Sequence, residues 1–332
     1  MNPGKRRVMS GMRPSGPLHL GHLVGVLTQW EAYCRDDDAF FEIADLHAYT
    51  TQFADPQVIR DAREAMVAVW LSAGVDPNRS TIFLQSGVPE ISELHALLAM
   101  ITPVSWLERV PTYKGQIEAL GQNIATYGFL GYPLLQLCDI AVVRGQYVPV
   151  GRDQVAHLEL GREIVRRFNH LYGEGREILV EPQATLSQFS EVPGTDGRKM
   201  SKSYDNAILI ADDEATTTKK VRSMLTDPLK VRRGDPGRPE ICPLFALWRF
   251  VDPMRLDEVA AACRTGALGC VQDKTDFAEA LNAYLRPVRE RYAHFRSEPE
   301  LVRGIIADGT ERTRAIASET LASVRHAMKL SP

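Results

Sequence analysis

The stretch RVMSGMRPSGPLHLGH, residues 7–22, joins a short apolar segment to a loop rich in glycine and proline and then to an amphipathic segment. Residues 7–10 are predicted to form a strand, and residues 20–33 a helix with apolar side chains at helical spacing. The start of a helix offers free backbone N–H groups and a positive dipole, which favour phosphate binding. His19 and His22 lie three residues apart, so both project from one side of the first helical turn. The stretch therefore predicts a phosphate site where a strand leads into a helix.

Strands and helices alternate through the first two-thirds of the chain. Further strands are predicted at residues 39–43, 81–84 and 146–150, with segments of helical length between them. One of these helices begins after a capping Asp55 and ends at Gly74. The alternation predicts an α/β fold, a Rossmann-like doubly wound parallel sheet with a C-terminal helical domain. In such a sheet, ligands bind at the carboxyl ends of the strands.

The length of 332 residues suggests two domains. Residues 1–183 are expected to form the Rossmann-like catalytic domain, in which residues 85–127 look like an insertion rather than a further strand–helix repeat. Residues 184–332 are expected to form a helical domain that begins with a lysine-containing loop. Its last helix is able to pack back on the catalytic domain.

The composition is that of an ordinary globular protein, with 44% apolar and 24% charged residues. Five scattered cysteines argue against a secreted disulfide framework. The first residues are basic without an apolar segment behind them, and no apolar run reaches membrane-spanning length, so a cytoplasmic protein without a membrane partner is expected. A net charge of −3 gives no overall nucleic-acid signature, so any RNA contact must come from a local patch.

A second motif, KMSKS at residues 199–203, lies between Gly194 and Gly197 on one side and Tyr-Asp-Asn on the other. Lys199 and Lys202 on a glycine-rich loop can bring two ammonium groups to a polyphosphate. A lysine pair of this kind is more often solvated surface, and an isolated His-x-x-His pair is more often a solvated loop. The occurrence of both motifs, about 180 residues apart, favours a shared phosphate site.

Together the motifs resemble the HIGH and KMSKS signatures of the class I aminoacyl-tRNA synthetases, and later residues narrow the resemblance to the bacterial tryptophanyl-tRNA synthetases. The resemblance runs nearly end to end, from Ser10 to about Met328. It implies a ligase that converts L-tryptophan and ATP to tryptophanyl-adenylate and pyrophosphate, and then transfers tryptophan to tRNA(Trp). It also implies a homodimer, with the 85–127 insertion as the contact surface.

The first of these reactions assigns roles to the motif residues. The substrate carboxylate attacks the α-phosphate, so the protein chiefly positions groups and neutralises charge. His19 and His22 are expected to donate hydrogen bonds to phosphate, and Lys199 and Lys202 to close over the β- and γ-phosphates, with Mg²⁺ sharing this task. The attacking carboxylate is already ionised, so neither histidine needs to act as a base. The residues expected to bind ATP are Met12, Arg13, Ser15, Gly21, His22, Gly151, Asp153, Lys199, Met200, Ser201, Lys202 and Ser203.

The segment GYPLLQLCDI, residues 131–140, is the expected centre of the amino-acid pocket. Asp139 lies in an otherwise apolar helix, where a lone carboxylate is costly unless it has a partner. An indole N–H is one such partner, and a neighbouring backbone group or Arg144 is the alternative.

The resemblance implies that Asp139 binds the indole nitrogen, and that Tyr132 and Gln154 contact the substrate amine. Gln136 replaces a methionine that is often found in the family, so the packing on the indole face stays open. The residues expected to bind tryptophan are Met9, His47, Tyr132, Gln136, Asp139, Val148, Val150 and Gln154.

The C-terminal third holds two further features. A basic run between residues 219 and 238 is either a solvated face or a tRNA contact. Cys242, Cys263 and Cys270 resemble an iron–sulfur set of some bacterial relatives, but Asp273 stands at the expected fourth cysteine. Because such clusters are normally held by four ligands of this kind, we expect a degenerate set without metal, and no metal fixed by the protein alone.

Three alternatives stay open at this stage. A tyrosyl-tRNA synthetase would share both motifs and the fold, and Asp139 argues against it. A small-molecule adenylyltransferase would use His19 and His22 but would not explain the lysine motif. A non-catalytic RNA-binding homologue would not need the intact histidines and lysines.

Overall fold

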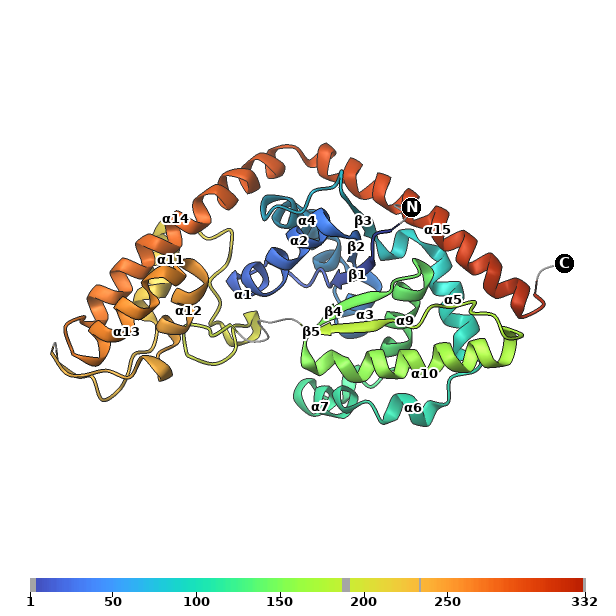
Figure 1. Ribbon diagram of the computed structural model, residues 1–332, viewed down its shortest axis with the longest axis horizontal. Coiled ribbons are helices and arrows are strands. Elements are labelled where there is room, and N and C mark those ends of the chain that lie inside the picture. The colour runs from blue at the N-terminus through green and yellow to red at the C-terminus, as the bar shows by residue number, and fades with distance from the viewer. Residues whose placement is uncertain (1–3, 187–191, 233, 331–332) are drawn as a thin grey trace.

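Five parallel strands form one sheet in the computed structural model, which describes residues 4–186, 192–232 and 234–330 (Figure 1). The strand order is β3-β2-β1-β4-β5, so the connections change direction between β1 and β4. The predicted doubly wound parallel sheet is confirmed, and the crevice for a ligand falls at this change of direction. The strands are β1 (Arg7–Met12), β2 (Asp38–Ile43), β3 (Ser80–Leu84), β4 (Tyr147–Val150) and β5 (Gln183–Leu186).

The strand β5 was not predicted from the sequence. All of its residues are exposed, so it shows no apolar alternation, and it pairs only with β4 at one edge of the sheet. The sheet therefore extends a few residues beyond the position at which the sequence suggested a helical domain.

Ten helices within residues 4–186, which are called the sheet part, surround the sheet, and a further helix from the end of the chain packs on it. The segment predicted as one helix over residues 20–33 is divided into α1, a π-helical segment and α2. The capping at Asp55 is as predicted, because its carboxylate accepts the Val58 N–H at the start of α4. These helices are α1 (Leu20–His22), α2 (Thr28–Asp36), α3 (Asp45–Gln52), α4 (Pro56–Ser72), α5 (Pro89–Ala99), α6 (Val104–Glu108), α7 (Pro111–Leu120), α8 (Tyr127–Leu130), α9 (Tyr132–Val142) and α10 (Val155–Tyr172).

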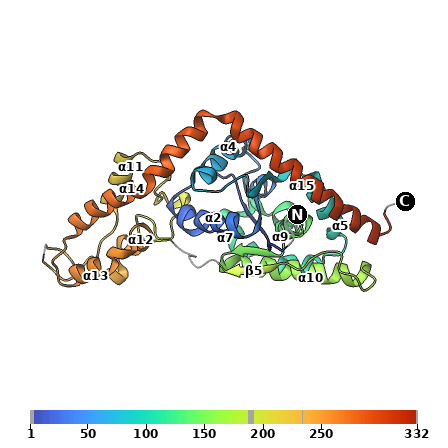
Figure 2. The same ribbon diagram turned by 45° about the horizontal axis from the view of Figure 1, so that its top comes forward.

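Beyond the sheet the chain forms the helical part, residues 192–297, and then returns. Figures 1 and 2 show two long helices meeting as an arch, the first in the helical part and the second running back over the sheet part. The helices from this point on are α11 (Glu214–Ser223), α12 (Pro243–Val251), α13 (Leu256–Arg264), α14 (Cys270–Ser297) and α15 (Pro299–Ala327).

The returning helix α15 lies directly against the edge strand β3. The Leu84 N–H donates to Thr310 Oγ1 at 3.0 Å. A Cβ atom on Gly309 would stand 1.9 Å from the carbonyl oxygen of Ile82, so the two backbones touch where glycine has no side chain. The helix thus covers an edge that would otherwise be open to another strand.

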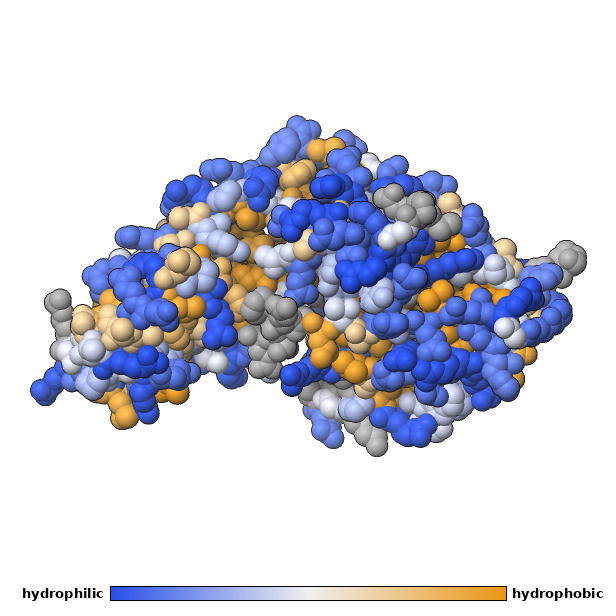
Figure 3. Space-filling model, viewed as in Figure 1, coloured by the Kyte–Doolittle hydropathy of each residue, from blue (hydrophilic) through white to orange (hydrophobic). Residues whose placement is uncertain are grey.

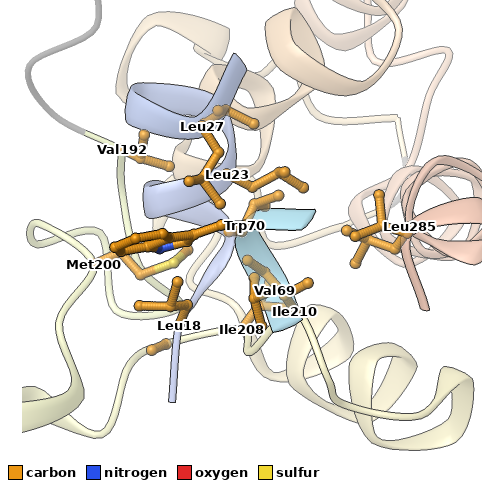
Figure 4. Packing of buried hydrophobic residues seen from close by; sticks show 14 of the residues in the cluster. Leu18, Leu23, Leu27, Val69, Trp70, Val192, Met200, Ile208, Ile210 and Leu285 are labelled. Atoms are coloured by element: carbon orange, nitrogen blue, oxygen red, sulfur yellow. The ribbon is translucent and has the colours of Figure 1, made fainter. Parts of the chain in front are cut away.

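Apolar packing joins the two sequence motifs. Figure 4 shows Leu18 and Leu23, from either side of the first motif, near Val192 and Met200 from the loop of the second. The backbone supports this contact, since the Leu20 N–H donates to the Ile208 carbonyl at 2.8 Å. The lysine loop is therefore anchored to the start of α1 by core side chains.

The surface in Figure 3 is mostly hydrophilic, with apolar side chains in patches over both parts. Among the described residues, no helix has the length and apolar character needed to cross a membrane.

Candidate active site

A cavity of about 380 Å³ lies at the carboxyl ends of β1 and β4. The walls of this first cavity come from β1, β2, β4, α3 and α9 and from the loop after β4. All eight residues expected to bind the amino acid line it: Met9, His47, Tyr132, Gln136, Asp139, Val148, Val150 and Gln154. The fold thus brings residues that are spread over almost 150 sequence positions to one cavity.

A second cavity, of about 560 Å³, adjoins the first and shares Ser10, His22 and Gly151 with it. Most of the expected ATP residues line one or the other. Those on the second cavity are Gly21, His22, Gly151, Lys199, Met200 and Ser201, and His19 lies there too. Met12 and Arg13 line the first cavity. The side chains of Asp153 and Ser203 lie outside the described residues.

The two histidines of the first motif are neutral at neutral pH. Burial, with the charge of nearby Lys202, lowers the pKa of His19 to about 4. Burial, with His19 and Lys202 nearby, lowers the pKa of His22 to about 3. The His19 backbone N–H donates to His22 Nδ1 at 3.2 Å, so the ring proton of neutral His22 is on Nε2. The pair can donate hydrogen bonds without adding charge.

Lys202 already holds the loop closed. Its Nζ donates to the Ser15 carbonyl at 2.9 Å, which ties the second motif to the loop before α1. Burial and the charge of Arg13 lower the pKa of Lys202. Lys199 is exposed, whereas Met200 between the two lysines is buried. The loop therefore has an apolar anchor with one lysine on either side.

Asn206 fixes the shape of this loop, a role that the sequence analysis missed. Its Oδ1 accepts the Ser201 N–H at 2.8 Å, and its Nδ2 donates to Asp196 Oδ1 at 2.7 Å and to the Lys199 carbonyl at 3.1 Å. A Cβ on Gly194 would stand 2.4 Å from the Asn206 amide, so glycine is needed there. The Tyr-Asp-Asn sequence after KMSKS was the available signal.

Asp139 is buried, and the hydrogen-bond partners that the described residues give it are the side chains of His47 and Gln85 rather than Arg144. His47 Nε2 lies 2.9 Å from one carboxylate oxygen, and Gln85 Nε2 donates to the other at 2.8 Å. The Arg144 guanidinium instead donates to Thr320. Gln85 also accepts the His47 backbone N–H at 3.2 Å, so the three side chains form one buried network.

A second polar network holds Tyr132 and Gln136. The amide oxygen of Gln136 lies 3.1 Å from His157 Nδ1, which places the ring proton on that nitrogen. His157 Nε2 then accepts the Tyr132 hydroxyl proton at 2.8 Å. The glutamine that replaces the methionine of the resembling family is thus held by a buried histidine, and the sequence carried no signal for this pairing.

The three-cysteine region is organised by other groups. Trp248 Nε1 donates to Asp273 Oδ1 at 2.9 Å, so the residue at the expected fourth cysteine position has an indole partner. Lys230 Nζ donates to the carbonyls of Cys263 and Leu268. In the part of the chain that the structure describes, no three His, Cys, Asp or Glu side chains are grouped to hold a metal. The absence of a cluster here stays a prediction.

The lowered pKa values of His19 and His22 predict a loss of stability in acid. Below pH 6.5 these two histidines are protonated in the unfolded chain but remain neutral in the native protein. The free energy of unfolding should therefore decrease as the pH is lowered from 6.5 to about 4. His22→Gln should make this decline shallower in urea titrations between pH 7.5 and 4.5, whereas His326→Gln, at an exposed position, should not. Parallel curves for the wild type and His22→Gln would contradict the burial of a neutral ring.

The amino-acid sequence is similar to those of known proteins over nearly its whole length. The chain matches the family model for class I tRNA synthetases (W and Y) over residues 1–286. It is 43% identical to the tryptophan–tRNA ligase of Thermotoga maritima over 331 residues, covering 98% of this chain and 99% of the relative. It is 41% identical to that of Ralstonia nicotianae over 394 residues, covering 98% of each.

Solved structures agree. The tryptophanyl-tRNA synthetase of Campylobacter jejuni, complexed with ADP and tryptophan, superposes with a TM-score of 0.87 at 33% identity, covering 97% of this chain and 99% of that one. The tyrosyl-tRNA synthetase of Aeropyrum pernix superposes with a TM-score of 0.67 at 20% identity, covering 91% of this chain and 90% of that one. At this low identity the similarity establishes a shared fold and no shared function. The chain carries both signature motifs beside two adjoining cavities, and it matches the family model and these relatives over most of its length. It therefore belongs to the class I tRNA synthetases of the tryptophan and tyrosine family.

Proposed function

We propose that this protein is a tryptophan–tRNA ligase that activates L-tryptophan with ATP and transfers it to tRNA(Trp). The observation that carries the proposal is the pair of adjoining cavities. One has a buried carboxylate among apolar walls, and the other lies between neutral histidines and a lysine loop. The names of the close relatives, and the ADP and tryptophan in the Campylobacter structure, support this assignment.

In the proposed reaction, ATP occupies the second cavity and tryptophan the first. Because the cavities share His22 and Gly151, the α-phosphate can meet the substrate carboxylate at their junction. His19 and His22 donate to phosphate oxygens, and Lys199 and Lys202 neutralise the charge that leaves with pyrophosphate. Lys202 has to exchange the Ser15 carbonyl for a phosphate oxygen, so the loop is already close to its working position.

Mg²⁺ is the metal proposed to accompany ATP, where it would share phosphate charge. Among the described residues lining the second cavity there is no Asp or Glu. This lining fits a cation held by phosphate oxygens rather than by protein carboxylates. Lys199 lines the second cavity, whereas Lys202, which is bonded to Ser15, lines neither cavity and is proposed to move onto the phosphates.

The first cavity suits an indole amino acid. Met9, Val148 and Val150 supply apolar wall, and Asp139 supplies a buried acceptor for the ring N–H. Tyr132 and Gln154 are proposed to contact the amine. Asp139 is also bonded to His47 and Gln85, so an analogue that lacks the ring N–H loses one hydrogen bond to a buried carboxylate, and this loss discriminates between substrates.

Amino-acid-dependent pyrophosphate exchange tests the proposal. With tryptophan, tyrosine and phenylalanine compared at equal concentration, exchange should be seen with tryptophan at a rate on the order of a thousand-fold or more above the others. A preference for tyrosine would establish the tyrosyl alternative. A lack of exchange with all three would favour a non-catalytic RNA-binding homologue or another adenylyltransferase.

Contact with tRNA is proposed for the exposed part of the basic run. Lys230 is buried, and Lys220 and Arg238 form ion pairs with Asp212 and Asp227. Besides Arg238, the described basic residues of the run that are exposed are Lys219 and Arg222 on α11 and Arg232 in the loop beyond it. We place the reaction in the cytoplasm, where tRNA is charged.

A homodimer is also proposed, with the insertion at residues 85–127 as its contact surface. Met100 and Val104 on this segment are 78% and 58% exposed and lie four residues apart, and exposed apolar side chains that are grouped mark association surfaces. Light scattering at micromolar concentration should give twice the mass of the chain. Met100→Glu should shift the protein towards the monomer, whereas Met254→Glu, at a still more exposed position in the helical part, should not. A monomeric wild type would contradict this surface assignment.

A further inference from the structure

A carboxyl group without a role in the proposed reaction lies at the wall of the first cavity. Glu42 is on β2, is 2% exposed, and lines the cavity together with Asp139. It stands opposite Gly11 in the pairing of β1 with β2. A Cβ on Gly11 would lie 3.0 Å from Glu42 Oε2 and 3.3 Å from its Cβ, so the side chain fills the space that glycine leaves.

The surroundings of Glu42 supply acceptors rather than donors. Its Oε1 is buried and has no hydrogen-bond partner among the described residues. Asp139 on α9 is its close neighbour, and the donors near Asp139, His47 and Gln85, are bonded to Asp139 itself. Asp45 on α3 adds a further negative charge, which Arg63 on α4 partly offsets at 2.5 Å.

Two acceptors cannot share a buried contact unless one of them carries a proton. Burial, the charge of Asp139, the hydrogen bond to Asp139 and the charge of Asp45 all raise the pKa of Glu42 well above its usual value. A protonated Glu42 donates to Asp139 and removes the repulsion between the two groups.

We propose that Glu42 is a positioning residue that stays protonated at neutral pH and donates its proton to Asp139, so that the pair carries a single negative charge facing the substrate ring. The inference deepens the proposed function and rests on it, because it concerns how tryptophan is recognised. Glu42 orients the Asp139 carboxylate towards the indole N–H together with His47 and Gln85. Ionisation of Glu42 would put two charges at the base of the pocket.

The first test measures unfolding, which does not depend on activity. Above pH 4.5 the unfolded chain releases the proton of Glu42, whereas the native protein keeps it. The contribution of Glu42 to the free energy of unfolding is therefore fully present below pH 4.5 and is lost as the pH rises. Glu42→Gln removes this dependence. The ratio of the wild-type to the Glu42→Gln unfolding constant should therefore rise with pH between roughly 5 and 7, by about tenfold per pH unit while native Glu42 keeps its proton. A ratio that is constant over this range would show an ionised Glu42 and overturn the proposal.

The second test measures tryptophan binding without ATP, by calorimetry. Glu42→Gln keeps a donor to Asp139 and should bind tryptophan within about threefold of the wild type at pH 7, whereas Glu42→Leu should bind about tenfold more weakly. The amide of Gln then rescues the binding that the apolar side chain of Leu loses. Equal dissociation constants for Leu and Gln would overturn the positioning role, and if Glu42→Leu fails to fold, the unfolding ratio of the first test still decides.

The proposed function and the proposed role of Glu42 can be contradicted independently of each other. If the wild type shows no tryptophan-dependent exchange, the proposed function is wrong whatever Glu42 does. If exchange is normal but neither the unfolding ratio nor the rescue by glutamine is seen, only the role of Glu42 is wrong.

Discussion

Lys202→Ala should slow formation of tryptophanyl-adenylate several hundred-fold, because a group that stabilises transition-state charge is typically worth about 3 to 4 kcal/mol. The affinity for tryptophan should hardly change, since Lys202 contacts the loop of the first motif and not the first cavity. Single-turnover measurement of adenylate by rapid quench gives the rate, and calorimetry gives the affinity.

Lys219→Ala is the matched control for this variant. It removes the same charge from an exposed position in the helical part and should leave the adenylation rate unchanged. A wild-type rate for Lys202→Ala would show that the lysine serves only to close the loop on Ser15.

Gly309→Val should destabilise the protein by about 3 kcal/mol or more, because its side chain would occupy the space of the Ile82 carbonyl. The helix α15 would have to move off β3, and the Leu84–Thr310 hydrogen bond would be lost with it. Urea unfolding measures the change.

Gly304→Ala, five residues earlier on the same helix, supplies the comparison. A Cβ there meets no atom within 4 Å, so the substitution should stabilise by roughly 0.4 to 1 kcal/mol through the unfolded state. Similar unfolding midpoints for the two variants would mean that α15 does not press on β3.

The sheet could be predicted because β1, β2 and β3 carry buried apolar residues and β4 alternates buried valines with partly buried residues. Phe40, Phe41 and Ile43 on β2 show this pattern, and so do Ile82 and Phe83 on β3. The strand β5 could not be predicted in this way, because its side chains are exposed and its register is set by the neighbouring β4. The local sequence pattern indicates which residues are buried. It does not indicate an exposed edge strand that is held by backbone hydrogen bonds.

The candidate site was predictable where residues lie in motifs and was less so where they pair across the fold. The positions around His19, Lys199 and Asp139 form recognisable segments. The partners of Asp139 are separated from it by 54 residues at Gln85 and 92 at His47, a distance at which no periodicity reports a contact. Glu42 did leave a signal, a single charge within an apolar strand, and a charge in that setting needs a partner.

The contact between α15 and β3 also has a consequence for how the protein is made. Leu84 and Thr310, which join the two elements, are 226 residues apart. At a synthesis rate of 5 to 20 residues per second, roughly 10 to 45 seconds separate their emergence from the ribosome. During this interval the nascent sheet has an unprotected edge that can pair with other chains, so we expect chaperones to bind it. A premature stop codon shortly before residue 309 should accordingly yield aggregated protein rather than a shortened enzyme.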